Sequence, residues 1–517
     1  MRTPGSIVVV SGGSAANSLV DVFKSVSAGS PISYIIGISD NGGSTSELIR
    51  VFGGPGIGDI RSRLVRLVPD DTEDEERLRI KGLLNYRLPP SAEAARHEWN
   101  LIVEGTHQNW DGIPSEKKEL LRSFFILVAG EITKRTRPTS TFNFQLASLG
   151  NLFITGCRLF FGSLESAIFL FRSICGVPEY THVIPALNSN FSHHIAAGLA
   201  DDTVIAGQNQ ISHPSEEPAS SNHPVQMTGN QALLEVTAQL KNSSIIPRSP
   251  SGPTFGSTTP LNPGYSTPVT YLHDHDEVED ANLPGSLPAL RRGNIVFTKE
   301  EEAELPARIQ RVWYINPYGQ EIRPPANPKS LAAIRNAETL VYSIGSLYTR
   351  RMLIFEGSII PCLILRGMGE AIATSCKHKV LILNGSFDRE IGPGTTFTAL
   401  DFIKAIMSAC TESRGIIAGE PGFEQLTAEA EYKKYVTHVL YLEGDDVPKV
   451  DTAKFKNLGI ECWRIAGKKN EKGRGCLFEM SGLSQALDMI RGRKRSPKQR
   501  RSTVDSTRMQ FLPVLEA

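Results

Sequence analysis

Net charge, long apolar runs and paired cysteines are all scarce in this sequence of 517 residues. Its 55 basic and 55 acidic residues cancel to a formal net charge of zero, which excludes a protein that coats nucleic acid by bulk charge. No uncharged apolar stretch approaches the roughly 18 residues of a membrane-spanning helix, and the apolar run Ile7–Val10 near the start is short. We therefore expect no membrane span, no standard secretion signal and no nucleic-acid partner.

The seven cysteines have wide, irregular spacings without a C-x-x-C pair, and their number is odd. This pattern is typical of reduced, mostly buried thiols in the cytosol or the nucleus. The basic segment from Gly492 to Arg501 holds six Lys and Arg residues and fits either a nuclear-localisation patch or a solvated tail. We expect a cytoplasmic protein, with the nucleus as the alternative that this tail raises.

Proline is concentrated in one region of the chain. Eleven of the 32 prolines lie between Gly207 and Gly293, in a Pro/Ser-rich stretch whose low apolar content cannot offset the entropy cost of ordering it. We therefore expect a disordered insertion there. The predicted parts of the chain are an N-terminal block (1–206), the insertion (207–293), a C-terminal block (294–490) and a basic tail (491–517).

Short β-branched runs alternate with amphipathic stretches in both blocks. The N-terminal block predicts a strand over 7–10, a helix over 16–27 and a second strand over 32–39. In the C-terminal block four runs predict strands: LVYSIGS, CLIL, KVLILNG and HVLYLEG. Strands separated by helices indicate an α/β fold with a doubly wound, mostly parallel sheet. The two blocks either complete one sheet or form separate domains.

His193 and His194 are neighbours, and Asp201 and Asp202 follow them, so they are candidate metal ligands. On a predicted helix, neighbouring side chains point about 100° apart and chelate a metal poorly. We therefore expect no metal site at this pair.

The loops after the predicted strands are candidate binding sites, because ligands of open α/β sheets bind outside the carboxyl ends of the strands. The first loop contains Gly12, Gly13 and Ser14, follows the strand at 7–10 and opens a helix. Glycines let backbone N–H groups approach an anion, and the helix N-terminus favours negative charge. This loop fits a phosphate cradle or a plain strand-to-helix turn.

The second loop runs from Asp40 to Ser44. Asp40 fits a divalent-cation ligand or a partner for ribose hydroxyls, whereas Ser44 and the amides of Asn41, Gly42 and Gly43 fit a phosphate. The alternative is an Asn-Gly turn with a Ser/Thr helix cap.

A third loop carries Asp59 and Arg61 in the string G-D-I-R-S-R. Asp59 has the chemistry of a metal ligand or a general base, and Arg61 that of a bidentate phosphate clamp. An exposed structural ion pair explains both residues equally well.

Motifs in both blocks, taken in order, carry a resemblance to a known family. They are the first loop, D-N-G-G-S-x-S-x-L-x-R from Asp40, G-D-I-R from Gly58, G-N-L-F from Gly150, G-S-L-Y-T from Gly345, and Asn384-Gly385 followed by D-R-E. They resemble the motifs of the 2-phospho-L-lactate transferases and of their relatives, the bacterial gluconeogenesis factors. The resemblance covers nearly all of the two blocks and leaves out only the insertion and the tail.

The resemblance implies a Rossmann-like fold whose strand-end crevice holds a nucleotide diphosphate. For the transferases it implies that a phospholactyl group, activated as a guanosine diphosphate ester, passes with Mg²⁺ to the hydroxyl of a deazaflavin and releases GMP. For the gluconeogenesis factors it implies binding of a UDP-sugar without established chemistry. It also implies a homodimer.

On this resemblance, the loops of both blocks contribute to one site. Asp40 and Asn41 would lie at its acceptor or metal side, and Tyr348 would help to close the nucleotide pocket. The expected site residues are the catalytic Asp40 and Asp59, with Asp40 also the metal ligand, and the nucleotide- or phosphate-binding Gly12, Gly13, Ser14, Asn41, Gly42, Gly43, Ser44, Arg61, Asn151, Gly345, Ser346, Tyr348 and Thr349.

Two departures from the family patterns bear on the choice between its branches. The first loop reads SGGSAAN where gluconeogenesis factors usually have GGGTG, whereas the strings from Asp40 and Gly345 look closer to those factors than to the transferases. We predict a nucleotide-binding transferase resembling 2-phospho-L-lactate transferase, with Mg²⁺ as cofactor and a GDP-type or UDP-sugar ligand. The alternative is a non-catalytic, UDP-sugar-binding regulator of carbon metabolism.

Overall fold

The computed structural model describes most of the two predicted blocks. The described residues are 3–12, 15–39, 44–70, 74–137, 140–207, 305–345, 347, 359–387, 397–470 and 475–493. The predicted insertion beyond Gly207 and the tail beyond Arg493 lie outside them.

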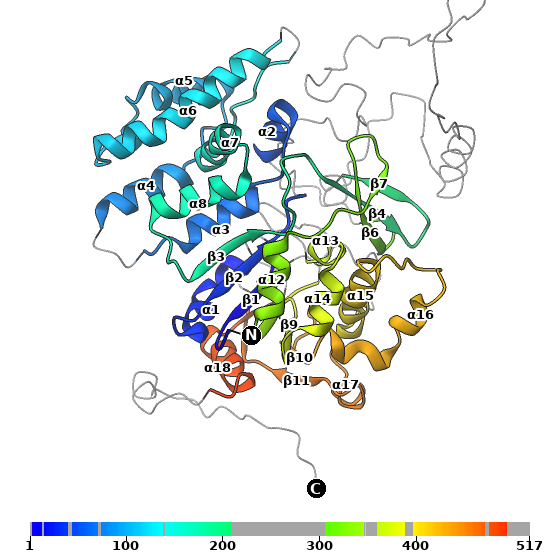
Figure 1. The fold of residues 1–517 in the computed structure, drawn as a ribbon. Coiled ribbons are helices and arrows are strands. Elements are labelled where there is room, and N and C mark those ends of the chain that lie inside the picture. The colour runs from blue at the N-terminus through cyan, green and yellow to red at the C-terminus, as the bar shows by residue number, and fades with distance from the viewer. Residues whose placement is uncertain are drawn as a thin grey trace, which may run out of the picture.

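Seven parallel strands form the central sheet, in the order β11-β10-β9-β8-β1-β2-β3 (Figure 1). The strands are β1 (Ile7–Val10), β2 (Ile32–Ile36), β3 (Thr181–Pro185), β8 (Thr339–Tyr342), β9 (His378–Ile382), β10 (His438–Tyr441) and β11 (Glu461–Arg464). The first three come from the N-terminal block and the other four from the C-terminal block, so both blocks build one sheet. The predicted α/β fold with a doubly wound, Rossmann-like sheet is confirmed.

β1 lies in the middle of the sheet, and its sequence, IVVV, is apolar toward both faces. All four residues are at most 2% exposed, as expected for a parallel strand that helices cover on both sides. Val10 lies opposite Ile35 of β2 and Tyr342 of β8. The central strand therefore takes one neighbour from each block of the chain.

One of the predicted strands is wrong. The run CLIL lies in and just after the helix α13 (Ile360–Leu363), whose four residues are all buried. A helix that is buried all round shows no polar face, so a short apolar run of this kind cannot be told from a strand by periodicity. The fourth strand that this block contributes to the central sheet is instead β11, a partly exposed edge strand with the sequence ECWR. The strand predicted over 32–39 is also shorter than expected, because β2 ends at Ile36.

Helices pack against both faces of the sheet (Figure 1). α1, α3 and α18 lie on one face, and α12, α13, α14 and α15 lie on the other. Their bounds are α1 (Val20–Ser27), α3 (Gly58–Leu67), α12 (Pro328–Asn336), α14 (Met368–Thr374), α15 (Ala399–Glu412) and α18 (Met480–Ile490). The helix predicted over 16–27 is divided into a 3-10 turn (Ala15–Leu19) and α1.

A further layer of helices extends beyond α3, at the edge where β3 lies (Figure 1). It consists of α4 (Glu75–Asn85), α5 (Ala92–Glu104), α6 (Ser115–Arg135), α7 (Leu149–Phe161) and α8 (Leu164–Cys175), and α2 (Ser44–Phe52) lies beside α7. Aromatic contacts stabilise this layer: the rings of Trp99 and Phe125, for example, meet edge to face with centroids 5.9 Å apart.

A four-stranded sheet, in the order β5-β4-β6-β7, links the two blocks a second time. Its strands are β4 (His194–Leu199), β5 (Val204–Ala206), β6 (Ile309–Ile315) and β7 (Glu321–Ile322). The helix expected at His193 and His194 is wrong, since β4 begins at His194. Successive side chains of a strand point to opposite faces, so this pair is again unsuited to chelating a metal.

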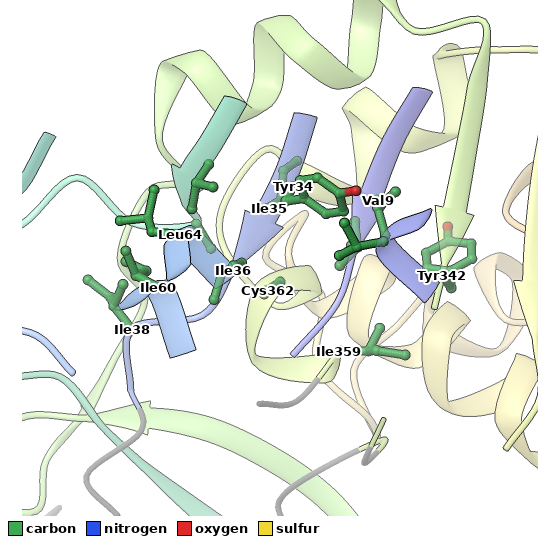
Figure 2. Packing of buried hydrophobic residues seen from close by; sticks show 14 of the residues in the cluster. Val9, Tyr34, Ile35, Ile36, Ile38, Ile60, Leu64, Tyr342, Ile359 and Cys362 are labelled. Carbon is green, nitrogen blue, oxygen red and sulfur yellow. The ribbon is translucent and has the colours of Figure 1, made fainter. Parts of the chain in front are cut away.

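The main core surrounds β1 and β2 (Figure 2). Ile60 and Leu64 of α3 pack beside Ile36, while Cys362 of α13 approaches the end of β2. These four side chains are completely buried. The seven cysteines are free thiols and five of them are buried, as predicted. Across the described ranges, the helices include none with the length and apolarity needed to cross a bilayer.

Candidate functional site

The direction of strand addition reverses at β1, because β2 lies on one side of it and β8 on the other. In open α/β sheets this switch point leaves a crevice at the carboxyl ends of the strands, and ligands bind there. The loops that follow β1, β2, β8 and β9 all begin at this edge. Most of the predicted site residues belong to these loops or to the elements that follow them.

The first loop is tied to α3 by a buried arginine. Nη2 of Arg63 donates to Oγ of Ser11 at 3.3 Å and to the carbonyl oxygen of Gly12 at 3.2 Å. The Arg63 guanidinium also lies over the Tyr34 ring, 4.5 Å from its centroid. Arg63 is completely buried, and burial lowers its pKa to about 10. Burial likewise raises the pKa of Tyr34 to about 12, so Tyr34 stays neutral and Arg63 stays charged at neutral pH.

Of the second predicted loop, the structure describes Ser44, which is the first residue of α2. Asn151 of α7 holds the start of α2 through hydrogen bonds. Nδ2 of Asn151 donates to Oγ of Ser44 at 3.3 Å and to Oγ1 of Thr45 at 3.4 Å. Oδ1 of Asn151 accepts from Nε of Arg61 at 3.4 Å, and Nη1 of Arg61 donates to Oδ1 of Asn85 at 3.3 Å. The structure therefore joins Ser44, Asn151 and Arg61, which come from three separate motifs, in one buried hydrogen-bond chain.

Gly150 explains why a glycine precedes Asn151 in the G-N-L-F motif. A Cβ at this position would lie 2.9 Å from Cγ of Arg61 and closer still to the carbonyl oxygen of Leu84. Real carbon atoms in contact stay near 3.5 Å or beyond. Only glycine therefore lets α7 approach α4 and Arg61 closely enough for Asn151 to reach its partners.

Asp59 lies in the first turn of α3 and is 1% exposed, and Arg61 is 4% exposed. Neither is at the surface, so an exposed ion pair is excluded. The Asp59 carboxylate interacts electrostatically with both Arg61 and Arg63 and favours their charged forms. Burial has the larger effect and lowers the pKa of Arg61 to about 9. Burial, and to a smaller extent the negative charge of Asp59, raises the pKa of the Cys362 thiol to about 12. One carboxylate therefore lies among two buried cations and a neutral thiol.

Asn384, which follows β9, holds the loop after β8. Its Oδ1 accepts from the backbone N–H of Gly345 at 3.0 Å, and its Nδ2 donates to the carbonyl oxygen of Gly345 at 2.8 Å. Gly345 has φ 142°, in the region that favours glycine. Ser343, directly after β8, is completely buried, and its hydroxyl has no hydrogen-bond partner among the residues that the structure describes. The second half of the crevice therefore contains a fixed turn and a buried hydroxyl.

The structure describes six of the predicted site residues: Gly12, Ser44, Asp59, Arg61, Asn151 and Gly345. Outside the described residues lie Gly13, Ser14, Asp40, Asn41, Gly42, Gly43, Ser346, Tyr348 and Thr349. Sequence reasoning missed Arg63, Ser343 and Asn85. A signal existed for Arg63, since it stands between Ile60 and Leu64 on the buried side of α3, where an arginine is unexpected.

Magnesium fits the described residues poorly. Within them no three His, Cys, Asp or Glu side chains come close enough together to hold a metal ion. Asp59 is a carboxylate of the kind that Mg²⁺ prefers, but the described residues that interact with it include Arg61 and Arg63, whose positive charge repels a cation. We therefore derive no step through a metal.

Comparison with known proteins identifies the family. A sequence model of the family described as 2-phospho-L-lactate transferase CofD matches residues 7–261 and 274–466. The uncharacterized protein YNL011C of Saccharomyces cerevisiae is 36% identical over 493 residues, covering 94% of this chain and 99% of that protein. A gluconeogenesis factor of Halalkalibacterium halodurans is 30% identical over 189 residues, which are 36% of this chain and 47% of that factor.

The fold is shared with a solved structure. The crystal structure of a UPF0052-family protein from Bacillus halodurans matches with a TM-score of 0.51 and 18% identity, and the match covers 93% of this chain and 99% of that one. At this identity the likeness supports the fold alone. The family match extends over most of the chain and includes strands from both blocks of the sheet, so the chain belongs to the 2-phospho-L-lactate transferase CofD family.

Proposed function

We propose that this protein binds a nucleotide through its phosphates in the switch-point crevice and transfers the group that the nucleotide activates, in the manner of 2-phospho-L-lactate transferase. The family match supports this proposal, and so do the glycine loop after β1 and the turn at Gly345. Backbone groups at such strand ends are well suited to phosphates, because glycine allows close approach.

The charge on α3 is the observation that carries the proposal. Arg61 and Arg63 are two buried cations under the crevice, and Asp59 is the carboxylate that interacts with both. A buried cation acts more strongly on a nearby anion than a cation in water does. A ligand phosphate in the crevice would be attracted by this charge, which favours a phosphorylated ligand over a neutral one.

Transfer of a phospholactyl group would need positioning and electrostatic stabilisation more than covalent help from the protein. The acceptor hydroxyl oxygen would form a bond to the phospholactyl phosphorus, and the bond from that phosphorus to the oxygen of GMP would break. The hydroxyl proton would pass to a base, and GMP would leave with the negative charge. We assign the role of base to Asp59, a buried carboxylate in the first turn of α3, and propose Asp40 as the residue on which Mg²⁺ dependence rests.

A second function has an observation in its favour. The relative from Halalkalibacterium halodurans that matches over 189 residues is named as a gluconeogenesis factor. The same crevice would then bind a UDP-sugar without turnover, and the protein would act as a regulator of carbon metabolism.

Isothermal titration of the full chain with GDP and with UDP-N-acetylglucosamine, each with and without MgCl₂, tests the proposal. Tighter binding of GDP that depends on magnesium supports the transferase. Tighter binding of the UDP-sugar without a magnesium requirement supports the regulator. Absence of binding by both nucleotides would contradict the proposed crevice itself.

A further inference from the structure

A groove of about 190 Å³ lies between the strand β6 and the helices α13 and α15 (Figure 1). β6 and the residue before it contribute five consecutive residues, from Arg308 to Val312. α15 contributes the face that carries Lys404, Ser408 and Glu412. The residues that line the groove include none of those expected at the switch-point crevice, so the groove is a separate feature of the chain.

One edge of β6 is open along most of its length. β4 pairs with the strand from end to end on one side, whereas β7 pairs only with Tyr314 and Ile315 on the other. No described strand pairs with Ile309–Trp313 on that second side. A groove along one face of a strand would be lined by alternate residues. The lining residues of β6 are consecutive, which indicates that its open edge faces the groove.

We propose that this groove binds an extended segment of a partner protein, which adds to β6 as a further strand beside α15. In an antiparallel sheet every second residue of an open edge turns its N–H and C=O groups outward. Another extended backbone matches such a row of donors and acceptors, and it does so in known cases of strand addition. The proposal goes beyond the proposed function, because it concerns a protein partner and not the nucleotide.

The walls of the groove fit an extended peptide in length and in polarity. The open edge from Ile309 to Val312 spans about 13 Å at 3.3 Å per residue, and α15 from Lys404 to Glu412 spans about 12 Å at 1.5 Å per residue. The apolar part of the lining comes from all three elements and includes Ile309, Val312, Ile364 and Ala405. An added strand would turn every second side chain toward these residues and the others away from them.

The charges of the lining favour an acidic segment. Its cations are Arg308, Arg311 and Lys404, and its carboxylates are Asp401 and Glu412. Nε of Arg311 donates to Glu412 at 3.0 Å, so this pair is neutral and connects β6 to α15. Arg308 and Lys404 form no ion pair within the described part of the chain. Two cations against one remaining carboxylate leave an excess positive charge, which attracts an acidic side chain.

A protective role makes a different prediction. Charged residues beside an open edge also keep other strands away and so prevent aggregation. If Arg308 and Lys404 served only this purpose, the groove would bind no peptide of either charge. Binding of a peptide, and its dependence on charge and on backbone N–H groups, therefore separate the two roles.

The experiment measures the fluorescence anisotropy of labelled peptides mixed with the full chain. The probe is a peptide of about seven residues, long enough to span the groove, in which glutamate alternates with valine. A second peptide alternates lysine with valine. A third repeats the probe with every backbone nitrogen methylated, which removes its backbone donors. We expect the probe to bind at least tenfold more tightly than either of the other two.

Variants of the full chain show whether the probe binds in the groove. Arg308→Glu and Lys404→Glu each reverse one charge and should weaken binding of the probe at least tenfold, while they strengthen binding of the lysine peptide. Both residues are exposed, and either variant that folds suffices. Lys456→Glu is the matched control, because Lys456 is an exposed lysine of α17 (Thr452–Asn457) outside the groove. It should leave both affinities unchanged.

Four results would overturn the proposal. The first is that the probe does not bind, and the second is that the methylated peptide binds equally well, because strand addition then plays no part. The third is unchanged affinity in the charge-reversal variants, which would place the peptide elsewhere. The fourth concerns the glutamates from Glu300 to Glu304, just before β6 in the sequence. If the probe binds only after these are replaced with glutamine, the chain itself occupies the groove and no external partner is needed.

Discussion

Replacing Gly150 with alanine should destabilise the protein, although alanine is the better helix former. Gly150 lies in α7, and an added methyl carbon would lie 2.9 Å from Cγ of Arg61 and closer still to the carbonyl oxygen of Leu84. Contacts between carbon atoms are favourable near 3.5 Å and beyond. The helices α4 and α7 would therefore have to separate by at least about half an ångström.

The expected cost follows from two opposing effects. Overpacking of this kind costs about 1–3 kcal/mol, and each hydrogen bond that Asn151 loses when α7 shifts adds about 0.5–1.5 kcal/mol. The helix propensity of alanine returns about 1 kcal/mol. We expect the free energy of unfolding to fall by about 2 kcal/mol.

Gly130 provides the control because it also lies inside a helix, α6, but an added Cβ there would meet nothing within 4 Å. Gly130→Ala should therefore raise the free energy of unfolding by about 0.5–1 kcal/mol. Urea unfolding followed by circular dichroism and tryptophan fluorescence measures both variants. The reasoning is refuted if Gly150→Ala is as stable as the wild type, or if the two substitutions have the same sign.

Three further predictions concern pH, the insertion and the second loop. Burial lowers the pKa of His194 to about 4, whereas a histidine of the unfolded chain titrates near 6.5. Because protons bind the unfolded state preferentially between these pH values, the free energy of unfolding should fall by up to about 3 kcal/mol as the pH drops from 6.5 to 4. His194→Gln should reduce this dependence when the free energy of unfolding is measured across the same pH range. Limited proteolysis should cut first between Ser215 and Gly293 and leave fragments that stay together on gel filtration, since both blocks contribute strands to one sheet; fragments that separate without denaturant would contradict this. Asp40→Asn should weaken magnesium-dependent nucleotide binding in titration calorimetry while changing the free energy of unfolding by no more than about 0.5 kcal/mol. Unchanged binding would mean that Asp40 has no role beyond the turn.

The sequence predicted the central sheet well because β-branched, doubly buried strands are distinctive. The run IVVV at Ile7–Val10 forms β1 over the same residues as predicted. CLIL was misread because hydrophobicity alone does not separate a buried strand from a buried helical turn. β11 was missed for the opposite reason: Glu461 and Arg464 make it look polar, as an edge strand is allowed to be.

The grouping of the site residues could be predicted only in part. Motif order indicated that Ser44, Arg61 and Asn151 belong to one site, but the hydrogen bonds that join them depend on how closely α7 approaches α3 and α4. That distance is set by the tertiary packing at Gly150. Arg63 was missed because two arginines in G-D-I-R-S-R look alike in the sequence, while only the fold shows that one of them points to the first loop.

The position of β1 between strands of both blocks has a consequence during protein synthesis. β1 leaves the ribosome first, but its partner β8 follows only after about 330 more residues, which takes roughly 15–65 s at common rates of translation. For that time the β8 side of a wholly apolar strand has no partner, and unpaired apolar edges promote aggregation. The nascent chain therefore has a long aggregation-prone interval, and N-terminal fragments that stop before Thr339 should need chaperones to remain in solution.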